Sequence, residues 1–148
     1  MNDAPKSAEA LRLAMLETQM RELEERRKAQ EAAQSERATF VDAFLKDDLS
    51  EREREMIRRL VLNAAADGKL EALVYSFPSE LCSDGGRAIN NGDPDWPDTL
   101  QGKARQLYER YKAVAQPLGY KLKAMIVSFP GGMPGDVGFF LNWEPDRV

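Results

Sequence analysis

The stretch from Ser7 to Ala38 contains neither glycine nor proline. Strong helix formers make up most of it, chiefly alanine, leucine, methionine, glutamate, glutamine, lysine and arginine. Ser7 is a suitable N-cap, and Glu17 with Arg21 has the favourable i,i+4 orientation of an ion pair. The sequence therefore predicts one helix of roughly 45 Å at 1.5 Å per residue, which is longer than a small domain can cover.

Large apolar side chains follow a 3-4 spacing near the start of this helix. They are Leu13, Leu16, Met20 and Leu23. The spacing is typical of a coiled-coil seam, but the next seam positions are polar. These positions are Arg27, Gln30, Gln34 and Arg37. The stripe therefore either mediates self-association or partner binding, or packs on the domain of the same chain.

A domain boundary is expected near residue 38, with an extended N-terminal helix over 1–38 as a possible coiled-coil arm. Residues 39–148 are expected to form a single compact α+β domain. An apolar cluster from Phe40 to Leu49 predicts a second helical segment. Ser50 and Glu53 form the capping-box pattern of another helix, which ends at Gly68.

Strand patterns occupy the second half of the chain. Strands are predicted over 70–77, 120–129 and 137–143, with an amphipathic helix over 100–116. The expected order is helix-helix-helix-β-α-β-β, with the last two strands paired as a hairpin. A right-handed crossover would place the first strand parallel to one of the others, which predicts a small three-stranded mixed sheet packed against a helix.

A polar loop over 79–99 holds the candidate ligand-binding residues. They are Asp84, Gly85, Gly86, Arg87, Asn90 and Asn91, together with Asp136 from the glycine-rich connection after the second strand. Adjacent glycines can turn backbone amides toward an anion, and an arginine can hold a carboxylate or phosphate with two hydrogen bonds. The same residues are also ordinary turn formers that need no ligand, so both interpretations stay open.

A weak internal similarity relates two of the predicted strands. Ala72–Pro78 aligns with Ala124–Pro130 at a constant offset, and each segment ends in Ser-Phe-Pro. The similarity is either a true repeat that places two equivalent corners around one site, or two unrelated strands with common turn residues.

The residue inventory excludes several kinds of chemistry. Histidine is absent and Cys82 is the single cysteine, so the chain has no Ser-His-Asp triad, Cys-His dyad, His-ligated metal or disulfide framework. We assign no catalytic residue, expect no metal or cofactor, and regard the protein as non-enzymatic rather than as an enzyme.

Charge and hydropathy bear on partners and location. The 148 residues carry a formal net charge of −4, and the basic run Arg26-Arg27-Lys28 follows directly on acidic residues, which makes nucleic-acid binding an unfavoured hypothesis. No apolar run is long enough to span a bilayer and no signal-peptide pattern is present, so we expect a cytoplasmic protein without membrane association.

The leading hypothesis is a cytoplasmic interaction or adaptor protein whose helical arm binds a protein partner or forms a homo-oligomer. The alternative is a small-ligand, anion-binding domain or minor enzyme that uses the loop over 83–98.

Overall fold

The computed structural model of the chain describes residues 7–145 and has the predicted α+β architecture. Two helices come first, and three strands with shorter helical segments follow. The chain divides into two compact units, Met1–Phe40 and Val41–Val148. The division falls inside the first helix, and we describe each unit by itself.

Helix α1 spans Ala8–Lys46. Ser7 caps its start, because the Ser7 Oγ accepts a hydrogen bond from the Ala10 amide at 3.1 Å. A separate helical segment was expected from residue 39, but α1 is continuous to Lys46, since no glycine or proline interrupts the sequence there. One long helix thus takes the place of two expected ones, and Phe44 in its last turns is buried in the second unit.

Helix α2 spans Glu51–Ala66 and begins with the predicted capping box. The Glu53 amide donates to the Ser50 Oγ at 3.1 Å, and the Ser50 amide donates to the Glu53 carboxylate at 3.2 Å. One face of α2 packs against the core through four apolar side chains. They are Ile57, Leu60, Val61 and Ala64.

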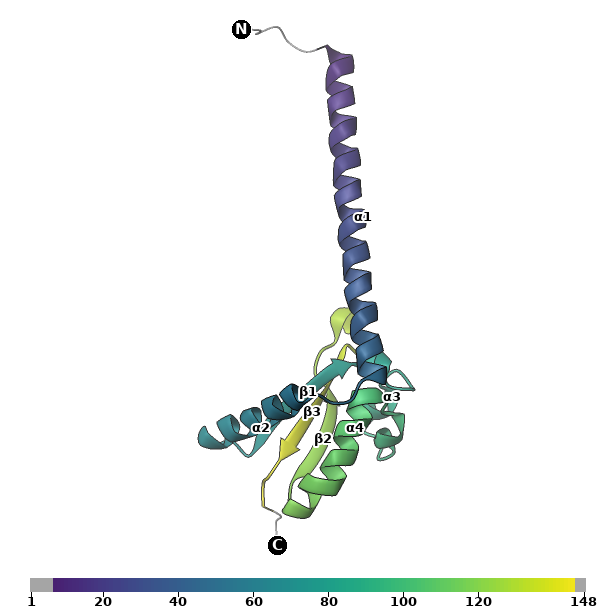
Figure 1. The fold of residues 1–148 in the computed structure, drawn as a ribbon. Helices are drawn as coiled ribbons and strands as arrows, with labels where there is room; N and C mark the ends of the chain where they lie inside the picture. Colours follow the sequence, from purple (N-terminus) through teal and green to yellow (C-terminus); the bar gives the residue numbers. More distant parts are fainter. Residues whose placement is uncertain (1–6, 146–148) are drawn as a thin grey trace. The chain divides into compact units, whose positions relative to one another are not determined.

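Three strands form the sheet: β1 (Glu71–Pro78), β2 (Lys121–Ile126) and β3 (Asp136–Asn142). The strand order is β1-β3-β2, and the predicted hairpin between β2 and β3 is present (Figure 1). Both neighbouring pairs are antiparallel, so the sheet is antiparallel rather than mixed as expected. The reason is that β3 lies between β1 and β2, which run in the same direction but never pair.

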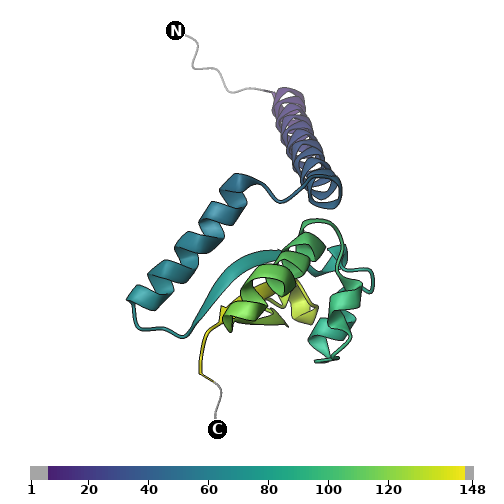
Figure 2. The same ribbon diagram turned by 60° about the horizontal axis from the view of Figure 1, so that its bottom comes forward.

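The remaining helices follow β1. Helix α3 (Arg87–Asn90) is a single turn, and α4 spans Gly102–Arg110. A π-helical turn over Tyr111–Ala115 and a 3₁₀ turn over Gln116–Leu118 extend α4, so the predicted helix over 100–116 is present in this composite form. Further 3₁₀ turns occupy Ser79–Leu81, Trp96–Thr99 and Pro130–Gly132. Figure 2 shows α4 lying across the sheet.

The core of the second unit lies between the sheet and its helices. Phe77 of β1 is central: its ring centroid is 5.4 Å from that of Phe44 and 5.3 Å from that of Phe139. Phe139 also approaches the Trp96 ring, at 6.0 Å between centroids. Aromatic side chains from four separate segments therefore stabilise one core.

Gly102 allows α4 to begin directly against the end of α1. Its φ is +56°, in the left-handed region, and a Cβ atom at this position would overlap the carbonyl oxygen of Phe44. Only glycine meets both conditions without strain, so Gly102 fixes how closely α4 approaches residues 44–45.

Candidate functional site

The stripe predicted on the N-terminal helix is exposed in the first unit. Its four side chains are between 51% and 61% solvent-exposed. They are Leu13, Leu16, Met20 and Leu23. The neighbouring Leu11 and Met15 are exposed as well. This part of α1 therefore presents a concentration of large apolar side chains to solvent, which is unusual on a protein surface.

The apolar stripe ends in charged contacts. Arg27, at the next seam position, pairs with Glu24 at 2.6 Å and with Glu31 at 2.5 Å. The Arg27 guanidinium lowers the pKa of the Glu24 carboxyl from its ordinary value. The stretch suited to an apolar contact is accordingly limited to the first half of the helix.

Asp84 is engaged by the backbone of its own loop. One carboxylate oxygen accepts from the Gly86 amide at 2.9 Å, and the other accepts from the Ala88 amide at 2.8 Å. Gly85 and Gly86 both have positive φ, and Gly86 also packs against Ser79, where a Cβ would come within 2.8 Å. The Asp84 carboxylate thus fixes the backbone at the start of the short helix α3, where it accepts from the N-cap residue Gly86 and from Ala88 inside the helix.

The other predicted loop residues lie on the surface. Arg87, Asn90 and Asn91 are exposed, and their segment forms the single turn of α3 and its end. Asp136 is exposed at the start of β3, opposite Pro78 in the sheet register. Within residues 7–145, no hydrogen bond or ion pair joins Asp136 to the loop residues.

Ser79 connects this loop to the sheet. Its amide donates to the Gly135 carbonyl at 2.8 Å, and its hydroxyl donates to the Pro134 carbonyl at 3.3 Å. Because Gly86 packs on Ser79, the structure brings Gly86 to the connection that precedes Asp136. The polar side chains of the two segments do not converge on a shared ligand position.

The two Ser-Phe-Pro corners differ in their surroundings. Phe77 is 2% exposed in the core, whereas Phe129 is 53% exposed. Pro78 lies at the end of a paired strand, whereas Phe129 and Pro130 lie beyond β2. The packing therefore favours unrelated strands with common turn residues over two equivalent copies.

Cys82 is buried beside this region and is a poor nucleophile. Burial raises the pKa of its thiol to about 11, although an interaction with Thr99 opposes the shift. The thiolate is the reactive form of cysteine, so the thiol is essentially protonated and unreactive at neutral pH.

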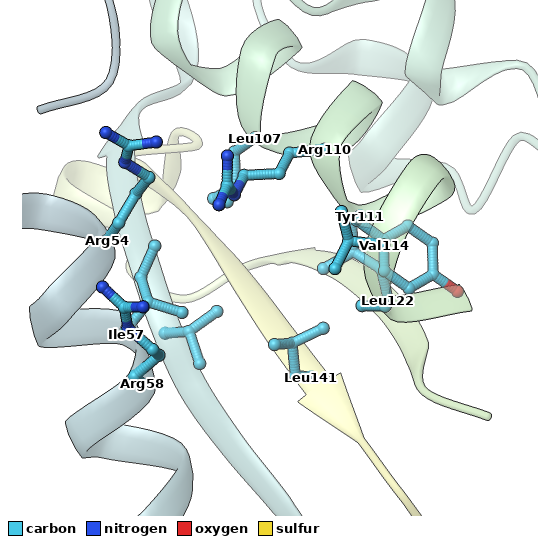
Figure 3. A pocket seen from close by; sticks show the side chains of 11 residues that line it. Arg54, Ile57, Arg58, Leu107, Arg110, Tyr111, Val114, Leu122 and Leu141 are labelled. Carbon is cyan, nitrogen blue, oxygen red and sulfur yellow. The ribbon is translucent and has the colours of Figure 1, made fainter. Parts of the chain in front are cut away.

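A pocket that the sequence did not indicate lies between α2 and α4 in the second unit (Figure 3). Its volume is about 250 Å³. All three strands and both helices contribute apolar side chains to its lining. They are Val74, Leu122 and Leu141 from the sheet, Ile57 from α2, Leu107 from α4 and Val114 from the π-helical turn.

Three arginines also line this pocket, and we call the whole feature the arginine groove. Arg54 and Arg58 come from α2, and Arg110 extends from α4 toward α2 (Figure 3). Figure 3 also shows that the apolar side chains of Leu122 and Leu141 lie along the sheet side of the groove. The groove thus combines an apolar floor with cationic groups from two opposite helices.

The charges in the groove are only partly compensated. Arg54 pairs with Glu51 at 2.7 Å, and Arg58 contacts Glu51 at 3.2 Å and Glu55 at 3.4 Å. Across the described range 7–145, Arg110 has no ion pair. Two glutamates therefore face three arginines, and the groove keeps an excess of positive charge.

One donor of an arginine that lines the groove lacks an acceptor. The Nε atom of Arg54 is buried and has no hydrogen-bond partner. Buried donors are nearly always satisfied in folded proteins, and an unsatisfied one costs about 1–3 kcal/mol. The Arg54 guanidinium therefore keeps unused hydrogen-bonding capacity beside the groove.

Sequence reasoning missed the groove because its parts are far apart along the chain. The sequence of α2 does contain one local pattern, an apolar residue between two cations at helical spacing: Ile57 between Arg54 and Arg58. That signal is equally typical of a solvated helix face. Arg110 lies near Arg54 and Arg58 only because α2 and α4 pack on the same face of the sheet.

Membrane-spanning helices and metal-binding clusters were sought in the part of the chain that the structure describes. None of the helices in the described part of the chain is long and apolar enough to cross a membrane. Residues 7–145 contain no group of three or more His, Cys, Asp or Glu side chains arranged to hold a metal ion.

No known protein family, curated protein or solved structure matches this chain.

Proposed function

We propose that the protein is a non-enzymatic interaction or adaptor protein that self-associates through the arm, which we define as residues 8–40 of α1. The observation that carries the proposal is the exposed stripe. Its four large apolar side chains occupy consecutive seam positions of a continuous helix. They are Leu13, Leu16, Met20 and Leu23. Covering such side chains with a second helix removes apolar surface from water, which drives association.

Charges beside the stripe favour a parallel pair of arms. With Leu13 and Met20 at the first seam position of each heptad, Arg12 of one copy would face Glu17 of the other. Two heptads later, Arg26 of one copy would face Glu31 of the other in the same way. An antiparallel arrangement would instead bring arginine opposite arginine and glutamate opposite glutamate, which disfavours it.

The polar half of the seam limits the strength of this contact. Beyond Leu23, the seam positions are occupied by arginine and glutamine, which do not fill the knobs-into-holes sites of a zipper. We therefore propose weak, reversible association rather than an obligate oligomer. A cytoplasmic location suits the proposal, because a free thiol such as Cys82 remains reduced there.

Sedimentation velocity of the full chain over a concentration series tests the proposal. The wild-type protein is expected to shift from monomer to dimer as concentration rises. Leu16→Glu places a charge in the seam and is expected to remain monomeric at every concentration. Met15→Glu is the matched control, because Met15 is 63% exposed on the same helix but lies outside the seam.

Two results would contradict self-association through the stripe. One is a wild-type protein that stays monomeric over the whole series. The other is a Met15→Glu variant that loses association as completely as Leu16→Glu, since the seam would then have no special role.

A further inference from the structure

We infer that the arginine groove binds a small amphipathic carboxylate, a molecule with one apolar chain or ring system and one carboxylate group. The inference is independent of the arm, because every lining residue belongs to the second unit. It also differs from the anion site considered for the loop over 83–98, since no residue of that loop lines the groove.

The floor of the groove accounts for the apolar part of the ligand. Val74, Leu122 and Leu141 come from three different strands, and Val114 in the opposite wall is 53% exposed. An apolar chain lying on these side chains would displace water from all of them at once.

The arginines account for the acidic group. A guanidinium presents planar, paired donors that match the two oxygens of a carboxylate. Arg110 has no ion pair within the described residues, and the buried Nε of Arg54 has no acceptor. A carboxylate between α2 and α4 would receive hydrogen bonds from both helices and would neutralise the excess positive charge.

The volume of the groove sets the size of the ligand. About 250 Å³ is slightly below the roughly 300–1,000 Å³ typical of pockets for drug-sized molecules. A folded partner would need about 800 Å² of surface on each side, which a pocket of this size does not offer. A single acyl chain of medium length is therefore the class of occupant that fits.

Titration of the full chain with decanoate tests the inference, with binding followed by calorimetry and by backbone amide NMR shifts. Saturable binding is expected, with the largest shifts at Val114, Leu141 and Arg110. Decanol has the same chain length without the carboxylate and is expected to bind at least about tenfold more weakly, because charged hydrogen bonds are lost.

Two variants locate the site. Arg110→Gln removes the exposed, unpaired cation and is expected to weaken decanoate binding about tenfold. Arg105→Gln is its matched control on the same helix, since Arg105 pairs with Glu109 at 3.3 Å and does not line the groove. Val114→Trp fills the groove from an exposed position and is expected to abolish binding while all three arginines remain.

Any of three results would overturn the inference. Equal affinity for decanoate and decanol would show that no carboxylate is recognised. Unchanged decanoate binding in both Arg110→Gln and Val114→Trp would place the ligand elsewhere. Absence of saturable shifts at groove residues would show that the groove does not bind this class of molecule.

Discussion

The arm and the second unit use large apolar side chains in opposite ways. In the arm, residues such as Leu13 and Leu23 are more than half exposed, and the contacts along the helix are ion pairs such as Arg27 with Glu24. In the second unit, residues 41–148, which we call the core unit from here on, Phe77 and Phe139 are at most 2% exposed and contact each other.

The arm and the core unit are therefore stabilised by different kinds of interaction. The arm is helical because its residues have high helix propensity and favourable local pairs, whereas the core unit depends on contacts between distant segments. Exposed leucines in the arm therefore contribute little to folding of the core unit. Their availability for contact with another molecule is what distinguishes them from the buried phenylalanines.

The largest expected effect is loss of a core aromatic. Phe139→Ala removes a fully buried ring that contacts Phe77 and Trp96, and it is expected to destabilise the core unit by about 4 kcal/mol. The matched change in the arm, Leu16→Ala, is expected to alter the unfolding free energy by less than about 0.5 kcal/mol. Urea unfolding followed by tryptophan fluorescence measures both, because Trp96 and Trp143 lie in the core unit. Comparable losses of unfolding free energy in the two variants would contradict the contrast between the arm and the core unit.

The next effect tests close packing within the core unit. Gly102→Ala combines a left-handed φ with overlap at Phe44 and is expected to cost roughly 3 kcal/mol. Gly119→Ala is the control: its φ is also positive, at +97°, but nothing lies within 4 Å of the added Cβ. This control is expected to lose about 1 kcal/mol from backbone strain alone. Thermal unfolding of the two variants distinguishes them, and equal losses would contradict the role assigned to Gly102.

A smaller, pH-dependent effect is expected at Glu53. Burial raises the pKa of its carboxyl, but hydrogen bonds from Lys103, at 2.6 Å, and from Ser50 outweigh burial and lower it below the ordinary 4.5. A lowered pKa in the folded state stabilises the protein above pH 4.5, and this stabilisation is lost as the pH falls through the folded-state value. Glu53→Gln is therefore expected to cost about 1–2 kcal/mol at pH 7 and much less near pH 3.

Chemical unfolding of wild type and Glu53→Gln at both pH values measures that difference. Glu51→Gln serves as the control, because the Glu51 side chain is 75% exposed and its ion pairs are expected to contribute less. A stability difference for Glu53→Gln that does not change with pH would contradict the ionic role of this residue.

The smallest effect on stability is expected for a substitution in the arm. Arg27→Ala removes the contacts to Glu24 and Glu31, which are exposed to solvent. Circular dichroism is expected to show a slight loss of helix, and the unfolding midpoint of the core unit is expected to stay unchanged. A clear shift in that midpoint would show that the arm stabilises the core unit and would weaken the contrast between them.

Local patterns predicted much of the fold. The long helix, the Ser50–Glu53 capping box and the three strands are all present close to their expected positions. The strand order was not predictable in the same way, because alternation of apolar residues shows which face of a strand is buried but not which strand lies beside it. The continuation of α1 past residue 38 was missed because the change in composition near Phe40 reflects a change in burial, not in backbone conformation.

The candidate sites differ in how far the sequence revealed them. The exposed stripe depends on helical spacing within a single element, so its residues were identifiable from the sequence. The engagement of Asp84 by the Gly86 and Ala88 amides depends on loop geometry that composition does not determine. Arg54 and Arg110 line the same groove only because tertiary packing brings α2 and α4 together. No local sequence pattern indicates this packing.

Disulfide cross-linking through the seam tests the central claim most directly. Met20→Cys in the full chain would place two thiols at facing seam positions of a parallel pair of arms, close enough for a disulfide. Thr18→Cys lies off the seam and serves as the control, while the native Cys82 is only 3% exposed and does not interfere. Mild oxidation is expected to give a covalent dimer with Met20→Cys and little or none with Thr18→Cys. No dimer with Met20→Cys, or equal yields from the two variants, would contradict self-association through the stripe.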